Sequence, residues 1–112
     1  MAIPDAITVG AGDKATAAVN TAVVITYAAK QYGRHALASI NLSYNAAPTG
    51  GNVKVEDGAG TTVFELDITA AGPCSIMFNN PMVLSENKAM LITLAAAGAA
   101  VTGKLNVQHY VM

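Results

Sequence analysis

Short stretches of alternating apolar and polar residues, separated by turn-forming clusters, make up this chain from residue 21 onward. The clusters recur roughly every 8 to 12 residues, a spacing typical of β-sandwiches and small barrels. Because the alternation has the period of a strand, whereas an amphipathic helix repeats about every 3.6 residues, the chain is expected to be all-β. The stretches are residues 21–28, 34–44, 51–57, 61–68, 75–78, 88–94 and 101–111.

The alternation also predicts which side chains face the core. In residues 34–44, Ile40, Leu42 and Tyr44 share one face, and small polar residues occupy the other. Each strand is therefore expected to have one buried face and one solvent-exposed face. In the other stretches the predicted core-facing residues are Val23, Ile25, Tyr27, Val53, Val55, Phe64, Leu66, Ile68, Met90, Ile92, Leu94, Leu105, Val107, His109 and Val111.

Glycine, proline and asparagine mark the places where strands end. Residues 57–60, Asp-Gly-Ala-Gly, lie between two alternating stretches and predict a hairpin. Turns are also expected at residues 47–51, 70–73 and 79–81, which leaves residues 75–78 as a short strand. The uncharged residues 95–100 are too few for an independent helix, so we expect an exposed hairpin loop there.

A chain of 112 residues is typical of one domain. We expect residues 21–112 to form a single antiparallel β-sandwich, jelly-roll-like with about eight strands. The alternative is an immunoglobulin-like sandwich. Residues 1–20 are expected to form an N-terminal arm, with residues 7–9 as a candidate first strand.

Charge is scarce: charged residues make up 12% of the chain, hydrophobic residues 53%, and the formal net charge is −1. This composition excludes intrinsic disorder, and without basic runs we expect no binding to nucleic acid or to an anionic membrane surface. The longest uncharged apolar stretch, residues 89–103, is shorter than the about 20 residues that span a bilayer. Few charges leave little repulsion between copies, which favours self-association or docking on a large partner.

No residue pattern typical of an active site, a cofactor site or a metal site is visible. Cys74 is the only cysteine, so it has no CxxC partner and is expected to be a buried thiol. His35 and His109 lie on separate expected strands, and their spacing is not that of a metal motif. We therefore predict a protein without catalytic residues, cofactor or metal.

The predicted hairpin carries several charged residues. Glu65 and Asp67 share a strand face, and Glu56 is placed to face them across the hairpin. Lys54 on the neighbouring strand is expected to pair with Glu65 or Asp67, the usual cross-strand arrangement. A solvated sheet face is therefore expected, rather than a cation site or an acid-base pair.

The most specific local motifs are the Ser-Tyr-x-x-x-Pro-Thr-Gly-Gly turn of residues 43–51 and the Asp-Gly hairpin at residues 57–58. Together with residues 64–73 and 101–110, they resemble small all-β structural proteins of tailed bacteriophages, in particular the capsid decoration, or cement, proteins. The resemblance begins at residue 34. It implies a β-sandwich, often a jelly roll, that oligomerises on the outside of the capsid and bridges neighbouring major capsid proteins.

The resemblance implies two partners, the major capsid protein and further copies of this chain, with a homotrimer expected rather than a homodimer. It places the protein on the capsid exterior of the virion. Synthesis in the host bacterial cytoplasm is expected, because the N-terminus lacks the pattern of a secretory signal. We expect the contacts to lie in the arm and in the loop of residues 95–100, at Ile3, Pro4, Ile7, Val9, Ala95, Ala96, Ala97, Ala99 and Ala100.

Two other functions fit the same sequence, because a fold does not determine a function. One is a ligand- or glycan-binding module that uses Tyr32, Tyr44 or Tyr110 as aromatic contacts. The other is a tail or head-tail accessory protein of the virion.

Overall fold

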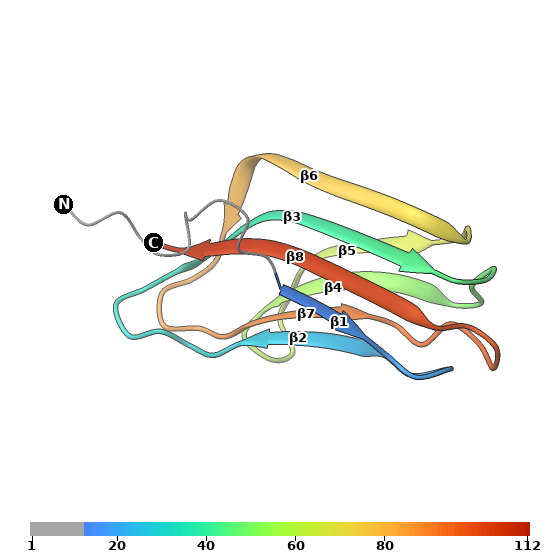
Figure 1. Ribbon diagram of the computed structural model, residues 1–112. Coiled ribbons are helices and arrows are strands. Elements are labelled where there is room, and N and C mark those ends of the chain that lie inside the picture. The colour runs from blue at the N-terminus through green and yellow to red at the C-terminus, as the bar shows by residue number, and fades with distance from the viewer. Residues whose placement is uncertain (1–12) are drawn as a thin grey trace.

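Eight strands build the part of the chain that this computed structural model describes, residues 13–112. Figure 1 shows them stacked in layers along the length of the molecule. Within these residues, no helix is long and apolar enough to cross a membrane. The strands are β1 (Asp13–Thr16), β2 (Val23–Tyr27), β3 (His35–Tyr44), β4 (Gly51–Asp57), β5 (Thr62–Ile68), β6 (Gly72–Val83), β7 (Met90–Leu94) and β8 (Gly103–Val111).

The strands form two four-stranded sheets with the orders β1-β8-β3-β6 and β2-β7-β4-β5, and neighbouring strands are antiparallel. The chain crosses from one sheet to the other at every connection except the β4–β5 hairpin. Two sheets of this kind form a jelly roll, so the expected fold is confirmed. An immunoglobulin-like sandwich would divide its strands unevenly between the sheets.

The core lies between the two sheets and is formed mainly by the faces that the alternation predicted. Burial of one Leu or Ile side chain contributes about 1.5–3 kcal/mol, and the core residues come from both sheets. Apolar burial therefore holds the layers together. The largest fully buried side chains are Leu37, Ile40, Met90, Ile92, Leu94, Leu105, Val53, Val55 and Val107.

Strand β5 departs from the predicted pattern. Ile68 is buried as expected, but Phe64 is only partly buried and Leu66 is 41% exposed. The prediction of Leu66 as a core residue is therefore wrong. The reason is that β5 is an edge strand, so its inward face has strand neighbours on one side only.

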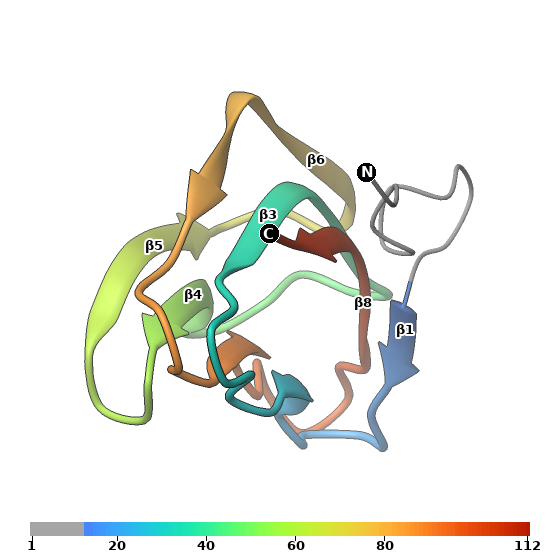
Figure 2. The same ribbon diagram turned by 90° about the vertical axis from the view of Figure 1, so that its left-hand side faces the viewer.

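The turn expected at residues 70–73 lies where the chain passes from β5 to β6, with bends at residues 70 and 71 and a φ of 94° at Gly72. The expected short strand at residues 75–78 is wrong, because it is part of a longer strand, and the turn expected at residues 79–81 is a corner within that strand. Strand β6 runs without a break from Gly72 to Val83 and includes Pro81. Its register with β3 shifts, because Leu37 is opposite Met82 while Ser39 is opposite Met77. The extra β6 residues form the sharp corner seen in Figure 2. An edge strand tolerates both the irregularity and the proline.

Residues 95–100 form a crossing between sheets and not the expected hairpin loop, because β7 and β8 belong to different sheets. Two backbone hydrogen bonds hold this segment against neighbouring parts of the chain. The N–H of Ala95 donates to the carbonyl of Asn52 at 2.8 Å, and the N–H of Thr49 donates to the carbonyl of Ala97 at 2.8 Å.

Strand β1 lies within residues 1–20, the range expected as an arm. It pairs with β8, with Asp13 opposite Val107 and Thr16 opposite Lys104. The candidate strand at residues 7–9 lies outside the described residues. The described sandwich therefore starts at Asp13.

Tyr44 connects the ends of several strands. Its hydroxyl donates to the carbonyl of Ala95 at 2.7 Å, and the side chain is 2% exposed. The backbone packs against the Tyr44 ring at two glycines. A Cβ at Gly51 would lie 3.1 Å from Tyr44 Cε2, and one at Gly103 would lie 3.4 Å from Tyr44 Cε1. These glycines allow the backbone to approach the ring from both sides.

Replacing Gly51 by alanine is expected to lower the free energy of unfolding by about 1–3 kcal/mol, the usual cost of overpacking. The new Cβ would lie 2.6 Å from the carbonyl oxygen of Ile68, a backbone atom that pairing holds in place. Urea unfolding of the variant measures the change.

Gly103→Ala is the matched control. Its Cβ would meet the terminal Cδ2 of Leu94 at 2.9 Å, and a side-chain methyl can move aside more easily than a carbonyl. An equal or larger loss in Gly103→Ala would contradict this account of the packing.

Candidate functional site

The predicted contact residues fall into different surroundings. Ile3, Pro4, Ile7 and Val9 lie outside the described residues. In the crossing of residues 95–100, the exposed alanines are Ala96, Ala99 and Ala100, whereas Ala95 is partly buried and Ala97 lies in the core at 1% exposure. Ala97 is therefore not on the surface that a partner would meet.

The tyrosines proposed for glycan contacts do not form an exposed aromatic group. Tyr44 is buried, Tyr110 is partly buried, and only Tyr32 is largely exposed, at 83%. Tyr32 has a φ of 61° in the turn before β3. Stacking on sugars or bases requires accessible ring faces, so Tyr44 cannot provide one.

Among residues 13–112, four of the eight exposed large hydrophobic side chains belong to the edge strands β5 and β6, one from each sheet; we call these two strands the β5–β6 edge. Figure 2 shows these strands on the side away from β1. Phe64 and Phe78 meet edge-to-face across this side, with ring centroids 5.4 Å apart, and both are partly buried. Exposed residues of the β5–β6 edge are Val63 (46%), Leu66 (41%), Met77 (75%) and Val83 (44%).

The β5–β6 edge combines two properties that favour association. Its large apolar side chains reach solvent, and such groups often mark protein interaction sites. As outer strands, β5 and β6 also present backbone N–H and C=O groups that no other strand of the described residues pairs on that side. A partner can bury the side chains and bond to the backbone.

The charged residues of the β4–β5 hairpin do not gather into an acidic site. Lys54 is opposite Glu65 in the register, but its Nζ lies 3.6 Å from Glu56 Oε1. Glu56 is buried, and its Oε2 accepts a hydrogen bond from the N–H of Gly60 at 2.6 Å. The expected pairing of Lys54 with Glu65 or Asp67 is therefore replaced by a pair within β4. Glu56 stabilises the turn.

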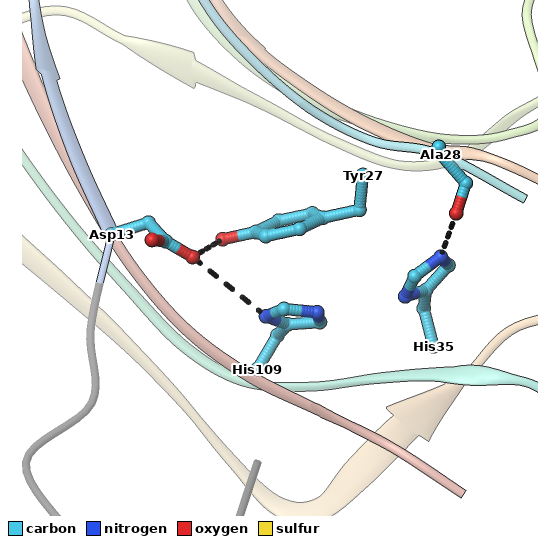
Figure 3. Close-up of polar contacts among 5 residues, drawn as sticks. All are labelled: Asp13, Tyr27, Ala28, His35 and His109. Atoms are coloured by element: carbon cyan, nitrogen blue, oxygen red, sulfur yellow. Dashed lines mark hydrogen bonds and ion pairs between the residues drawn. The ribbon is translucent and has the colours of Figure 1, made fainter. Parts of the chain in front are cut away.

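A second cluster joins four strands at the opposite side of the sandwich: Asp13 on β1, Tyr27 on β2, His35 on β3 and His109 on β8. Figure 3 shows the Tyr27 ring over the His109 ring, with Asp13 on one side and His35 on the other. The ring centroids of Tyr27 and His109 are 3.6 Å apart, and those of His35 and His109 are 5.4 Å apart.

Asp13 links Tyr27 and His109. The Tyr27 hydroxyl donates to Asp13 Oδ2 at 2.6 Å, and the same oxygen lies 3.9 Å from His109 Nδ1. Burial, the hydrogen bond to Asp13 and the charge of that carboxylate raise the pKa of Tyr27 above its ordinary value. The phenol therefore stays protonated and remains a donor. This bond ties the edge strands of the two sheets together.

The electrostatics of His109 favour its neutral form. Burial and the nearby His35 lower the pKa of His109, and the charge of Asp13 partly opposes them. A neutral imidazole keeps one ring nitrogen as a lone-pair acceptor and metal ligand.

His35 is almost fully buried, at 4% exposure. Its Nε2 lies 2.8 Å from the carbonyl oxygen of Ala28. Because a carbonyl oxygen only accepts, Nε2 carries a proton, and in the neutral ring Nδ1 then holds a lone pair. Among the described residues, this buried Nδ1 has no hydrogen-bond partner.

Sequence spacing did not predict this cluster because it depends on register and on an irregularity. His109 is opposite Leu37 and His35 is opposite Val111, so the two histidines are diagonal neighbours on paired strands. A register shift between Leu37 and Ser39 reverses the alternation of β3 and turns His35 toward the core side. The one feature of the sequence that pointed toward the cluster was the predicted core-facing position of His109.

Tyr27→Phe is expected to lower the free energy of unfolding by about 1 kcal/mol, because it removes the hydrogen bond to Asp13 but keeps the ring on His109. Amide hydrogen exchange in β1 should become faster. Tyr32→Phe is the matched control, since Tyr32 is 83% exposed and lies in a turn. Equal free energies of unfolding for the Tyr27→Phe variant and the parent chain would show that the hydrogen bond to Asp13 does not stabilise the fold.

Comparisons with known proteins identify a fold but no family. No family model matches the chain, and no curated protein matches its sequence. The crystal structure of PirA is similar with a TM-score of 0.50 at 8% identity, covering 86% of this chain and 92% of that chain.

Two further solved structures are similar at lower scores. One is the acidic stable capsid structure of Helicobacter pylori bacteriophage KHP30, with a TM-score of 0.47 at 16% identity, covering 91% of this chain and 94% of the other. The other is a family 16 carbohydrate-binding module, with a TM-score of 0.46 at 19% identity, covering 96% and 82%. At such identities the likeness concerns the all-β sandwich fold alone.

Proposed function

We propose that this chain is a non-enzymatic structural protein of a bacteriophage virion, which binds the outer surface of the capsid and stabilises it by bridging major capsid proteins. The observation that carries the proposal is the β5–β6 edge, two outer strands that carry exposed large apolar side chains and whose outer edges pair with no other strand among residues 13–112. The phage-type turn motifs of residues 43–51 and 57–58 agree with it.

A shell surface suits a protein of this kind. The chain has few charges and a net charge of −1, so copies can pack closely without strong mutual repulsion. The affinity of each single contact can be low, because an oligomer that bridges several capsid proteins binds at several points. Its overall affinity then exceeds that of a single site. The exposed residues Ala96, Ala99 and Ala100, together with Ile3, Pro4, Ile7 and Val9, remain proposed additional contacts.

Self-association is part of the proposal. A homotrimer with closed symmetry would present three equal binding surfaces to a local symmetry axis of a shell. The edge strand β6 offers backbone groups along much of its length for pairing with a neighbouring copy or with a capsid protein.

Binding to the shell can be measured by adding purified protein to undecorated capsids and separating bound from free chain by sedimentation. We expect saturable, stoichiometric binding. The double variant Leu66→Glu and Met77→Glu should bind at least about tenfold more weakly, because an interface penalises a buried unpaired carboxylate.

Val24→Glu is the matched control, because Val24 is 49% exposed on β2, an edge strand outside the β5–β6 edge. It should bind as the parent does. Equal binding by the double variant would exclude the β5–β6 edge as the contact, and no binding by the parent at micromolar concentration would overturn the proposed function.

Light scattering during size exclusion tests the oligomer separately. We expect a mass three times that of the 11.4 kDa chain. A dimer, or a monomer at every concentration up to the micromolar range, would contradict a preformed trimer.

A further inference from the structure

The chain contains two histidines, and both converge on one place in the fold, away from the proposed capsid contact. One of them, His35, is only 4% exposed and keeps an Nδ1 atom without a partner among residues 13–112. A buried polar atom left unpaired is costly. This lone pair is therefore available to a ligand that can accept it.

In each ring one nitrogen lies toward a protein oxygen, and for the other nitrogen no hydrogen bond is seen within residues 13–112. Nε2 of His35 donates to the carbonyl of Ala28, and Nδ1 of His109 faces the carboxylate of Asp13. His35 has the arrangement of metal-binding histidines, which commonly direct the other ring N–H to a backbone carbonyl or a carboxylate, and His109 has a carboxylate 3.9 Å away on the corresponding side. The atoms left over are Nδ1 of His35 and Nε2 of His109.

The two free nitrogens face one another across the gap between the rings in Figure 3. With metal–nitrogen bonds of about 2.0–2.1 Å and a tetrahedral angle, two imidazole ring centres lie roughly 5.2 Å apart. The observed separation of the His35 and His109 centroids is 5.4 Å. The rings are therefore spaced to hold one ion without a large movement of either strand.

We propose that the chain binds one divalent transition-metal ion that prefers imidazole, such as Zn²⁺ or Cu²⁺, between Nδ1 of His35 and Nε2 of His109. Within residues 13–112 no group of three or more His, Cys, Asp or Glu residues could hold a metal ion. Water therefore completes the coordination. The His109 side chain is 14% exposed and Asp13 is 56% exposed, so the ion enters from the Asp13 side.

Bound metal would act as a cross-link between β3 and β8 and, through Asp13, would order β1. An ion that binds only the folded chain stabilises it in proportion to the logarithm of its concentration above Kd. This inference is independent of the proposed capsid contact, because the β5–β6 edge contributes none of its residues.

The test uses the full chain without a histidine tag, stripped with a chelator and titrated with Zn²⁺. Calorimetry should show one saturable site, and thermal unfolding should shift to higher temperature. The ring resonances of both histidines should move together in NMR spectra. His109→Gln should abolish saturable binding, and Asp13→Asn should weaken it about tenfold, since residues that orient a ligand typically matter to that extent.

Three controls distinguish this site from metal binding elsewhere on the chain. Cys74→Ser should bind Zn²⁺ as the parent does, which excludes the thiol. Ca²⁺, which prefers oxygen ligands, should leave the stability unchanged. His35→Gln should also lose the metal. If that buried variant does not fold, the His109→Gln titration and the parent NMR spectra decide the question.

The proposal is overturned if millimolar Zn²⁺ leaves both histidine ring signals unchanged. It is also overturned if His109→Gln retains one-to-one binding, or if Cys74→Ser loses it.

Discussion

Strand β3 is paired on both of its edges, with β6 and with β8, and the rest of the structure depends on this pairing. Its inward residues Leu37 and Ile40 are fully buried between the sheets. At one end of β3, Tyr44 bonds to the segment that crosses between the sheets. At the other end, His35 lies beside His109. Both the core and the histidine cluster therefore follow from the place of this strand.

The two long sides of the sandwich differ. On one side, the hydrogen bond from Tyr27 to Asp13 joins the edge strands β1 and β2, which belong to different sheets. On the other side, β5 and β6 meet through the partly buried rings of Phe64 and Phe78 and leave Leu66 exposed. A closed side suits internal stabilisation. An open apolar side suits a partner, and this asymmetry is the basis of the proposed function.

The proposed binding regions have different chemistry because they have different neighbours. The β5–β6 edge has exposed apolar side chains and strand edges that no other described strand pairs, which suit a protein surface. The histidine cluster has ring nitrogens, a carboxylate and a buried His35 Nδ1 that has no partner among the described residues, which suit a small cation.

The sequence by itself determined the all-β class, a sandwich of about eight strands, the β4–β5 hairpin and most buried faces, because alternation and turn chemistry are local properties of the chain. It left the choice between a jelly roll and an immunoglobulin-like sandwich to the tertiary structure, which divides the strands evenly between two sheets. It did not determine the exposure of Leu66 or the length of β6. Both depend on which strands become edges. Only the tertiary structure decided that His35 and His109 meet, because a register shift in β3 and the pairing with β8 involve residues far apart in the sequence.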